Sequence, residues 1–279
     1  MEEKKFINIP EIVSSSLAKP WLSVIQMKIL MEKYKDECIF MPIDLDVYNE
    51  NVDFNIGDYE LNWVDNEKLV PPIMLGSGLL GLKNWMNLLR SCSTDSKRFV
   101  VMPLTMTVLI EKTNGELDKK GHLNMLIYDK TNYTLERYEP NGQQTPKRYN
   151  TVLLDQKLKQ IFGIVFNNKN IILLSPLDFC PIKGPQYIET ITRREYKQPI
   201  TKGSCGLWSF VYADARLSFP DKNRTDVQHL ILDEIQNNSP DLYSFIVKYL
   251  TDIVNISIEI FGASSKDEIN NILIRFVSK

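Results

Sequence analysis

The chain has 279 residues, of which 43% are hydrophobic and 24% are charged, and its formal net charge is −2. This mixture is typical of a globular protein with a sizeable core, and the small net charge argues against a nucleic-acid or membrane partner held by bulk electrostatics. The chain starts with charged residues, and no apolar run approaches the ~18 residues that a spanning helix needs. We therefore expect no signal peptide, no membrane segment and an intracellular location.

Hydrophobic periodicity and turn signals divide the chain into helices and strands. The predicted helices lie at residues 20–36, 79–90, 152–166, 205–217 and in much of the chain after residue 225. The predicted strands lie at residues 99–110, 122–128, 133–138 and 170–174. Turn signals at Asn114-Gly115 and at residues 129–132 join the first three strands, which predicts an antiparallel meander. The whole order predicts an α+β fold with a central, mainly antiparallel sheet flanked by helices.

The N-terminal quarter of the chain differs from the rest. Residues 40–72 are acidic and weakly periodic, so we expect an irregular arm there. Pro71-Pro72 should end this arm, because consecutive prolines continue neither a helix nor a central strand. We predict an N-terminal extension at residues 1–75 and one main domain at residues 76–279.

Cys205 has a sequence context that favours a reactive thiol. It follows Gly203-Ser204 and begins an apolar-periodic segment, so the positive end of a helix dipole should point at its sulfur. Gly203 and Gly206 would leave room for a substrate backbone. The alternative is that Cys205 is a small buried apolar residue, which is common for free cysteines.

The other cysteines are Cys38, Cys92 and Cys180, and we interpret all three as structural or incidental. The four cysteines form neither a C-x-x-C pair nor a Cys/His cluster with zinc spacing. In the reducing compartment that we expect, free thiols can remain reactive. The sequence therefore predicts no metal site.

The chain has two histidines, His122 and His229, as candidates for a general base. His122 follows Lys119-Lys120-Gly121 and begins a predicted strand, which would place its ring at an edge of the sheet. His229 lies in a predicted helix, where a lone histidine is more often a surface residue. We therefore expect His122 to be the base for Cys205.

A general base is oriented by a partner on its second ring nitrogen. If residues 122–128 and 133–138 pair antiparallel around a turn near Lys130, Glu139 lies beside His122. Asn141, two residues further along, is the alternative orienting residue.

The order His122, Glu139, Gln198, Cys205 resembles that of the adenovirus endopeptidase and of the SUMO and ubiquitin-like protein proteases (clan CE). Glu139 lies seventeen residues after His122, and Gln198 lies seven residues before Cys205. Both separations are similar to those of that family.

Two segments, residues 121–142 and 203–221, resemble the family members encoded by large nucleocytoplasmic DNA viruses. The similarity extends over about residues 98–221. SUMO proteases commonly have Trp after the histidine and Asp before the cysteine, where this chain has Leu123 and Ser204.

The resemblance implies a ubiquitin-like-protease fold for residues 76–279 and a cysteine protease that needs no cofactor or metal. It also implies that the side chain of Gln198 and the backbone amide of Cys205 form an oxyanion hole. Gln186, in the segment GPQYIET, is a second candidate for that glutamine. The substrate would be a viral polyprotein or a ubiquitin-like conjugate, cut after Gly-Gly or Gly-x-Gly. A viral member would act in the host cytoplasm or the virion.

Two other functions fit the same residues. An acetyltransferase of the related His-Glu-Cys type would use acetyl-CoA and need a basic pocket, for which the sequence offers no clear candidate. A catalytically inactive virion or binding protein could keep the same fold. The presence of Cys205, His122 and Glu139 together favours an enzyme.

Overall fold

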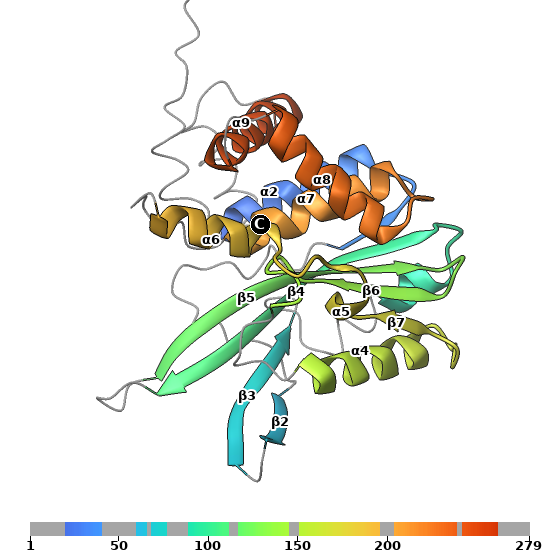
Figure 1. Ribbon diagram of the computed structural model, residues 1–279. Helices are drawn as coiled ribbons and strands as arrows, with labels where there is room; N and C mark the ends of the chain where they lie inside the picture. The colour runs from blue at the N-terminus through green and yellow to red at the C-terminus, as the bar shows by residue number, and fades with distance from the viewer. Residues whose placement is uncertain are drawn as a thin grey trace, which may run out of the picture.

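The computed structural model describes residues 20–40, 60–65, 68–76, 89–111, 117–144, 151–195, 204–238 and 242–261. In this part of the chain, a mixed seven-stranded sheet has helices on both faces (Figure 1). The α+β class predicted from the sequence is therefore confirmed. No helix in these residues is long and apolar enough to cross a membrane.

The strands form one continuous sheet around the long β4 and β5. They are β1 (Cys38–Ile39), β2 (Glu60–Asp65), β3 (Lys68–Gly76), β4 (Phe99–Glu111), β5 (Leu117–Asp129), β6 (Thr134–Tyr138) and β7 (Ile172–Leu174). Their order is β2-β3-β4-β5-β6-β7, with β1 beside β4. The neighbours from β2 to β6 pair antiparallel, which confirms the predicted meander, whereas β1 and β7 pair in parallel.

The helices follow most of the predicted ranges. They are α2 (Pro20–Lys33), α4 (Thr151–Val165), α5 (Pro176–Phe179), α6 (Pro185–Glu195), α7 (Ser204–Ser218), α8 (Arg224–Asn238) and α9 (Leu242–Phe261). Residues 89–93 are also helical, whereas most of the helix predicted at residues 79–90 lies outside the described residues. α5 and α6 occupy a stretch for which the sequence predicted only a loop.

Alternate side chains of β4 and β5 enter two different cores, because helices cover both faces of the sheet (Figure 1). One face contributes Phe99, Val101, Met125 and Ile127 to a core shared with α2, α7, α8 and α9. The opposite face contributes Val100, Met102, Leu126 and Tyr128 to a core shared with α4. This two-sided burial explains why residues 99–102 of β4 and 125–128 of β5 are apolar at every position.

Part of the predicted N-terminal extension belongs to the first core. Met27 and Leu30 of α2 are buried there together with Trp208 of α7. The hydroxyl of Tyr34 also donates a hydrogen bond to Asp214 Oδ1 of α7 (2.5 Å). The boundary near residue 75 stays a prediction, because the residues on either side of it are described only in part.

The predicted irregular arm contains two strands, so that part of the prediction is wrong. β2 and β3 form a hairpin, and β3 runs through Pro71-Pro72. The ladder skips both prolines: Val70 pairs with Trp63 and Ile73 with Leu61, with a shift of register between them. A bulge of this kind tolerates proline, because the missing N–H is not needed for a ladder hydrogen bond.

Cys38 and Cys92 form a disulfide, with Cα atoms 6.1 Å apart. Both cysteines are therefore structural, in agreement with the interpretation from the sequence, and neither is a free thiol. The two cysteines are 54 residues apart in sequence. They meet because β1, which contains Cys38, lies beside β4 (Phe99–Glu111), close to the helical residues 89–93. A contact made only by tertiary structure leaves no spacing signal in the sequence.

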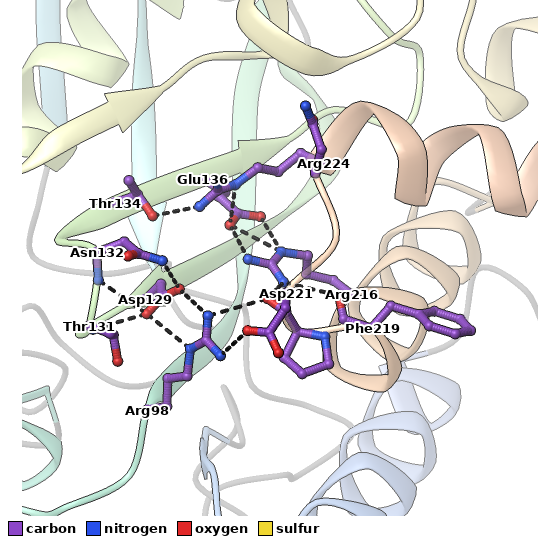
Figure 2. Close-up of polar contacts among 12 residues, drawn as sticks. Arg98, Asp129, Thr131, Asn132, Thr134, Glu136, Arg216, Phe219, Asp221 and Arg224 are labelled. Atoms are coloured by element: carbon purple, nitrogen blue, oxygen red, sulfur yellow. Dashed lines mark hydrogen bonds and ion pairs between the residues drawn. The ribbon is translucent and has the colours of Figure 1, made fainter.

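A charged cluster joins the α7–α8 corner to one end of the sheet (Figure 2). Glu136 of β6 is fully buried, and its Oε1 accepts hydrogen bonds from Arg216 Nη2 (3.1 Å) and Arg224 Nε (2.8 Å). The hydroxyl of Tyr212 donates to Oε2 of the same carboxylate (2.9 Å). Glu136 therefore fixes α7 and the start of α8 against β6.

Arg98 extends this cluster to the turn after β5 (Figure 2). Its Nη2 lies 3.1 Å from Asp129 Oδ2, and its Nη1 lies 2.7 Å from Asp221 Oδ1. Asp129 is buried, whereas the Asp221 side chain is 84% exposed. The buried end of the cluster should therefore contribute more to stability than its exposed end.

Candidate active site

Cys205 is the second residue of α7 and is partly exposed. The predicted helix start is confirmed, so the free N–H groups of the first turn surround the region of the sulfur. Gly206 follows and is buried, whereas Gly203 lies outside the described residues. The rest of α7 is anchored in the first core, which gives Cys205 a rigid support.

His122 lies within β5 and not at its start. β5 begins at Leu117, and residues 117–121 continue the pairing with β4, for example Lys120 with Val108. The prediction that His122 begins the strand is therefore wrong. Polar residues such as Lys120 can extend a strand beyond its apolar run, which hides the start of the strand from hydrophobic patterning.

The β5–β6 ladder ends before it reaches His122. β6 ends at Tyr138, which pairs with Met125, so no β6 residue pairs with the β5 residues before Met125. α7 approaches there, and Ser209 Oγ donates a hydrogen bond to the Leu123 carbonyl (3.2 Å). The early end of β6 therefore allows the cysteine-bearing helix to come close to the histidine-bearing strand.

His122 and Glu139 form a buried pair. His122 Nε2 lies 2.7 Å from Glu139 Oε1 and 2.9 Å from Glu139 Oε2. The Glu139 side chain is fully buried and that of His122 is 7% exposed. The predicted antiparallel pairing of β5 with β6 brings the two residues together, although in a shifted register: Tyr138 pairs with Met125 and not beside His122.

The pKa values of this pair are shifted in opposite directions. Burial alone would lower the pKa of His122, but the Glu139 carboxylate and the Cys205 sulfur raise it to about 10. Burial alone would raise the pKa of Glu139, but the His122 imidazolium and the hydrogen bonds from Asn141 and Asn124 keep it below its ordinary value. At neutral pH the pair is therefore an imidazolium and a carboxylate.

Cys205 is the second neighbour of His122, because its side chain hydrogen-bonds to the ring. Nε2 faces Glu139, so Nδ1 is the nitrogen that remains for the sulfur. The imidazole thus interacts with a partly exposed sulfur and with a fully buried carboxylate. Chemically, such an arrangement can move a proton from the sulfur to the ring and hold the resulting charge.

The alternative between Glu139 and Asn141 is answered by their contacts. Asn141 donates to Glu139 Oε1 from its backbone N–H (2.9 Å) and from Nδ2 (3.2 Å). Glu139 is thus the neighbour of His122, and Asn141 supports Glu139.

The structure describes only one of the two glutamines proposed for the oxyanion hole. Gln198 lies outside the described residues, so its role stays a prediction. Gln186 is in the first turn of α6, and its backbone N–H donates to the Pro140 carbonyl (3.1 Å), next to Glu139. Its side-chain Oε1 is buried with no hydrogen-bond partner among the described residues.

Asn124 was missed in the sequence analysis. It is fully buried and lies two residues after His122 on β5, so the two side chains share a face of the strand. Asn124 Nδ2 donates to Glu139 Oε2 (3.0 Å). The signal was present, because a polar residue at an alternate position of an apolar strand needs a buried partner.

One group of described residues has the donor atoms of a metal site. The sulfurs of Cys38 and Cys92 and a carboxylate oxygen of Asp95 lie within 4.8 Å of one another. The disulfide uses both sulfurs, and Lys130 Nζ forms an ion pair with Asp95. These residues therefore do not fit a metal ion in this state.

No protein-family model matches the chain, and no solved structure matches it. The chain is 28% identical over 234 residues to a protein of Acanthamoeba polyphaga mimivirus that is named as an ankyrin repeat protein. The match covers 79% of this chain but 28% of that protein, so the chain spans little more than a quarter of its relative's length. An ankyrin repeat is a unit of about 33 residues with two helices, whereas the described residues here form a seven-stranded sheet.

These findings contradict the resemblance to the adenovirus endopeptidase and SUMO protease family. No model of that family matches, and the mimivirus relative bears a different name. The resemblance depended on four residues and two short segments. Unrelated folds reach similar catalytic arrangements by convergence, so such motifs do not identify a family.

Proposed function

We propose that this chain is a thiol hydrolase, a cysteine peptidase or isopeptidase, in which Cys205 is the nucleophile. The observation that carries the proposal is the buried His122–Glu139 pair (2.7 Å) that hydrogen-bonds to a cysteine at a helix N-terminus. Burying a carboxylate against an imidazole has a desolvation cost, and such pairs are concentrated at functional sites. The proposal rests on this geometry and on no family assignment.

In the proposed reaction, the proton of Cys205 Sγ already rests on His122 as the imidazolium, and the sulfur, as a thiolate, attacks the carbonyl carbon of a peptide or isopeptide bond. The Cys205 backbone N–H stabilises the charge that develops on the carbonyl oxygen. The His122 imidazolium gives its proton to the leaving amine, and water then hydrolyses the thioester. Glu139 stabilises the imidazolium and holds Nδ1 toward the sulfur. Gln198 remains the proposed side-chain donor to the same oxygen.

We propose protein substrates with small residues, such as Gly-Gly or Gly-x-Gly, before the cut bond. Gly206 directly follows Cys205 and supports this choice, because it adds no side chain beside the nucleophile. The mimivirus relative supports a viral setting. The substrates there would be virion precursors or ubiquitin-like conjugates, in the infected cell or in the virion.

A covalent probe tests the proposal. A biotinylated peptide vinyl sulfone that ends in Gly-Gly should label Cys205, as mass spectrometry of the digested protein would show. Labelling should disappear in Cys205→Ala and slow by about 100-fold or more in His122→Ala, the loss typical of a general base. The matched control is His229→Ala, since His229 is exposed on α8 and should leave the labelling rate unchanged.

Two outcomes would contradict the proposal. One is equal labelling of Cys205 and the buried Cys180, and the other is an unchanged rate in His122→Ala. The alternative acetyltransferase would instead transfer a labelled acetyl group from acetyl-CoA to Cys205. A catalytically inactive binding protein would react with neither reagent.

A further inference from the structure

The carboxylate that orients His122 is itself held by a chain of buried polar contacts. Glu139 Oε2 accepts a hydrogen bond from Asn124 Nδ2 (3.0 Å). Asn124 Oδ1 accepts one from Arg137 Nη1 (2.9 Å). Asn124 and Glu139 are fully buried, and Arg137 is 1% exposed. A polar chain of this kind inside a sheet is costly unless every member is satisfied.

Arg137 determines which way the Asn124 amide faces. A guanidinium group can only donate hydrogen bonds, so the Asn124 oxygen must face Arg137. The Asn124 nitrogen then has to face Glu139, where it meets a carboxylate that can only accept. The direction of each hydrogen bond from Arg137 through Asn124 to Glu139 is therefore fixed by chemistry and does not depend on how the Asn124 amide is oriented.

Arg137 is anchored in turn by α4 on the other side of the sheet from α7. Its Nη2 donates to Asp155 Oδ2 (2.9 Å), and its Nε donates to Asp155 Oδ1 of the same carboxylate. This two-point pairing fixes the guanidinium plane. The Asp155 side chain is 15% exposed, so this end of the chain lies near the protein surface.

We propose that Asn124 and Arg137 are positioning residues of the active site, which hold the Glu139 carboxylate ionised and in line with His122. This inference rests on the proposed role of Cys205, His122 and Glu139. The Asn124 amide holds the Glu139 carboxylate where it faces His122, and only a carboxylate in that position stabilises the imidazolium fully. Loss of Asn124 should therefore weaken the proton affinity of His122 without any contact between Asn124 and the substrate.

The test compares Asn124→Leu with Tyr212→Phe. The leucine keeps a similar volume but cannot donate to Glu139. Tyr212→Phe is the control, because it removes a buried hydrogen bond to Glu136 of β6 and leaves Glu139 untouched, whereas Asn124→Leu removes the bond to Glu139 and the bond from Arg137. Two quantities are measured in each variant: the His122 pKa by NMR of the imidazole carbons, and the rate of Cys205 labelling by the vinyl sulfone probe.

We expect the His122 pKa to fall from about 10 toward its ordinary value in Asn124→Leu and to stay at about 10 in Tyr212→Phe. The labelling rate should fall by about tenfold or more in the first variant alone. Arg137→Lys should give an intermediate fall, since lysine keeps the charge but loses the planar fork.

An unchanged His122 pKa in Asn124→Leu, in protein that still folds, would overturn the inference. Equal losses of labelling in Asn124→Leu and Tyr212→Phe would overturn it too, because they would indicate a purely structural role. The two failures are separable. If the wild type is not labelled, the proposed function fails, and the His122 titration still decides whether Asn124 acts on Glu139.

Discussion

The site depends on one buried ion pair, and the residues around it explain how two charges remain stable there. Glu139 is surrounded by donors from His122, Asn124 and Asn141, so its charge is compensated without water. His122 has a carboxylate on one side and a sulfur on the other. Removing either member leaves the other as an unpaired buried charge, which is far more costly than losing a surface pair.

The raised pKa of His122 makes a prediction about stability and pH. A folded-state pKa of about 10 exceeds the ordinary value of 6.5, so the imidazolium stabilises the fold fully below about pH 6.5. This contribution is lost as the pH rises through about 10. Urea unfolding at a series of pH values should show the gap between wild type and His122→Ala shrinking over this window.

His229→Ala is the control for that series, since removal of an exposed surface side chain should change the free energy of unfolding little. The lowered pKa of Glu139 affects stability at acidic pH. Its contribution is present above about pH 4.5 and is lost as the pH falls through its folded-state value. A gap for His122→Ala that stays constant from about pH 6 to about pH 10 would contradict the assigned pKa.

The residues of the pair could be predicted from the sequence, and their supporting residues could not. Cys205, His122 and Glu139 were found because a helix start and an antiparallel hairpin are local patterns. In the sequence, Arg137 is simply a polar residue within a predicted strand. Its contact with Asp155 depends on how α4 packs on the sheet. Such a contact is tertiary, so no spacing rule predicts it.

At the scale of elements, the turn that carries Glu139 is locked to the loop before α6. Gly142 has a positive φ of 80°, and a Cβ atom there would lie 2.2 Å from the Pro181 carbonyl oxygen. Gly184 N–H donates to the Asn141 carbonyl (2.9 Å). The backbone at Gly142 and the backbone at Gly184 are therefore in direct contact, and a side chain at either position would separate them.

Gly184→Ala tests this contact. A Cβ atom at residue 184 would lie 2.3 Å from the Pro140 carbonyl oxygen, so the turn carrying Glu139 has to move. We expect a loss of roughly 1–3 kcal/mol in the free energy of unfolding, typical of overpacking, and slower labelling of Cys205. Urea unfolding and the probe measure the two effects.

Gly163→Ala is the matched control for the glycine test. Gly163 lies within α4, where a Cβ atom would be 3.3 Å from the Asn168 carbonyl oxygen, and alanine is the better helix former. Its unfolding free energy should change little and its labelling not at all. Similar behaviour of the two variants would show that the Gly184 contact does not position the site.

Helices and strands could be predicted where a single helical or strand periodicity of apolar residues dominates the segment. β4, β5 and β6 and the helix at Cys205 follow clear patterns. α6 was missed, because its polar and charged residues leave few apolar positions to reveal a helical stripe. β3 was missed because two prolines normally exclude a strand, and the bulge that accommodates them depends on the partner β2.

At the scale of the whole molecule, α7 connects two buried charged systems. Its N-terminus carries Cys205 against His122, and its C-terminal half carries Arg216 against Glu136 (Figure 2). Between them, the ring of Tyr212 stacks on Tyr138 of β6 with centroids 4.1 Å apart. The same strand, β6, therefore holds α7 at Glu136 and Tyr138 and leads directly into Glu139.

The last prediction compares the stability contributed by the buried and the exposed ion pairs of the charged cluster around Glu136 and Arg98. Glu136→Gln removes the carboxylate that pairs with the buried Arg216, and should lower the free energy of unfolding by about 3–5 kcal/mol. Asp221→Asn removes a partner that is 84% exposed and should cost less than about 1 kcal/mol. Urea unfolding of both variants at one pH measures the difference. Equal losses of unfolding free energy in the two variants would mean that burial does not determine how much these charges stabilise the fold. The packing of α7 on β6 would then depend on the apolar core instead.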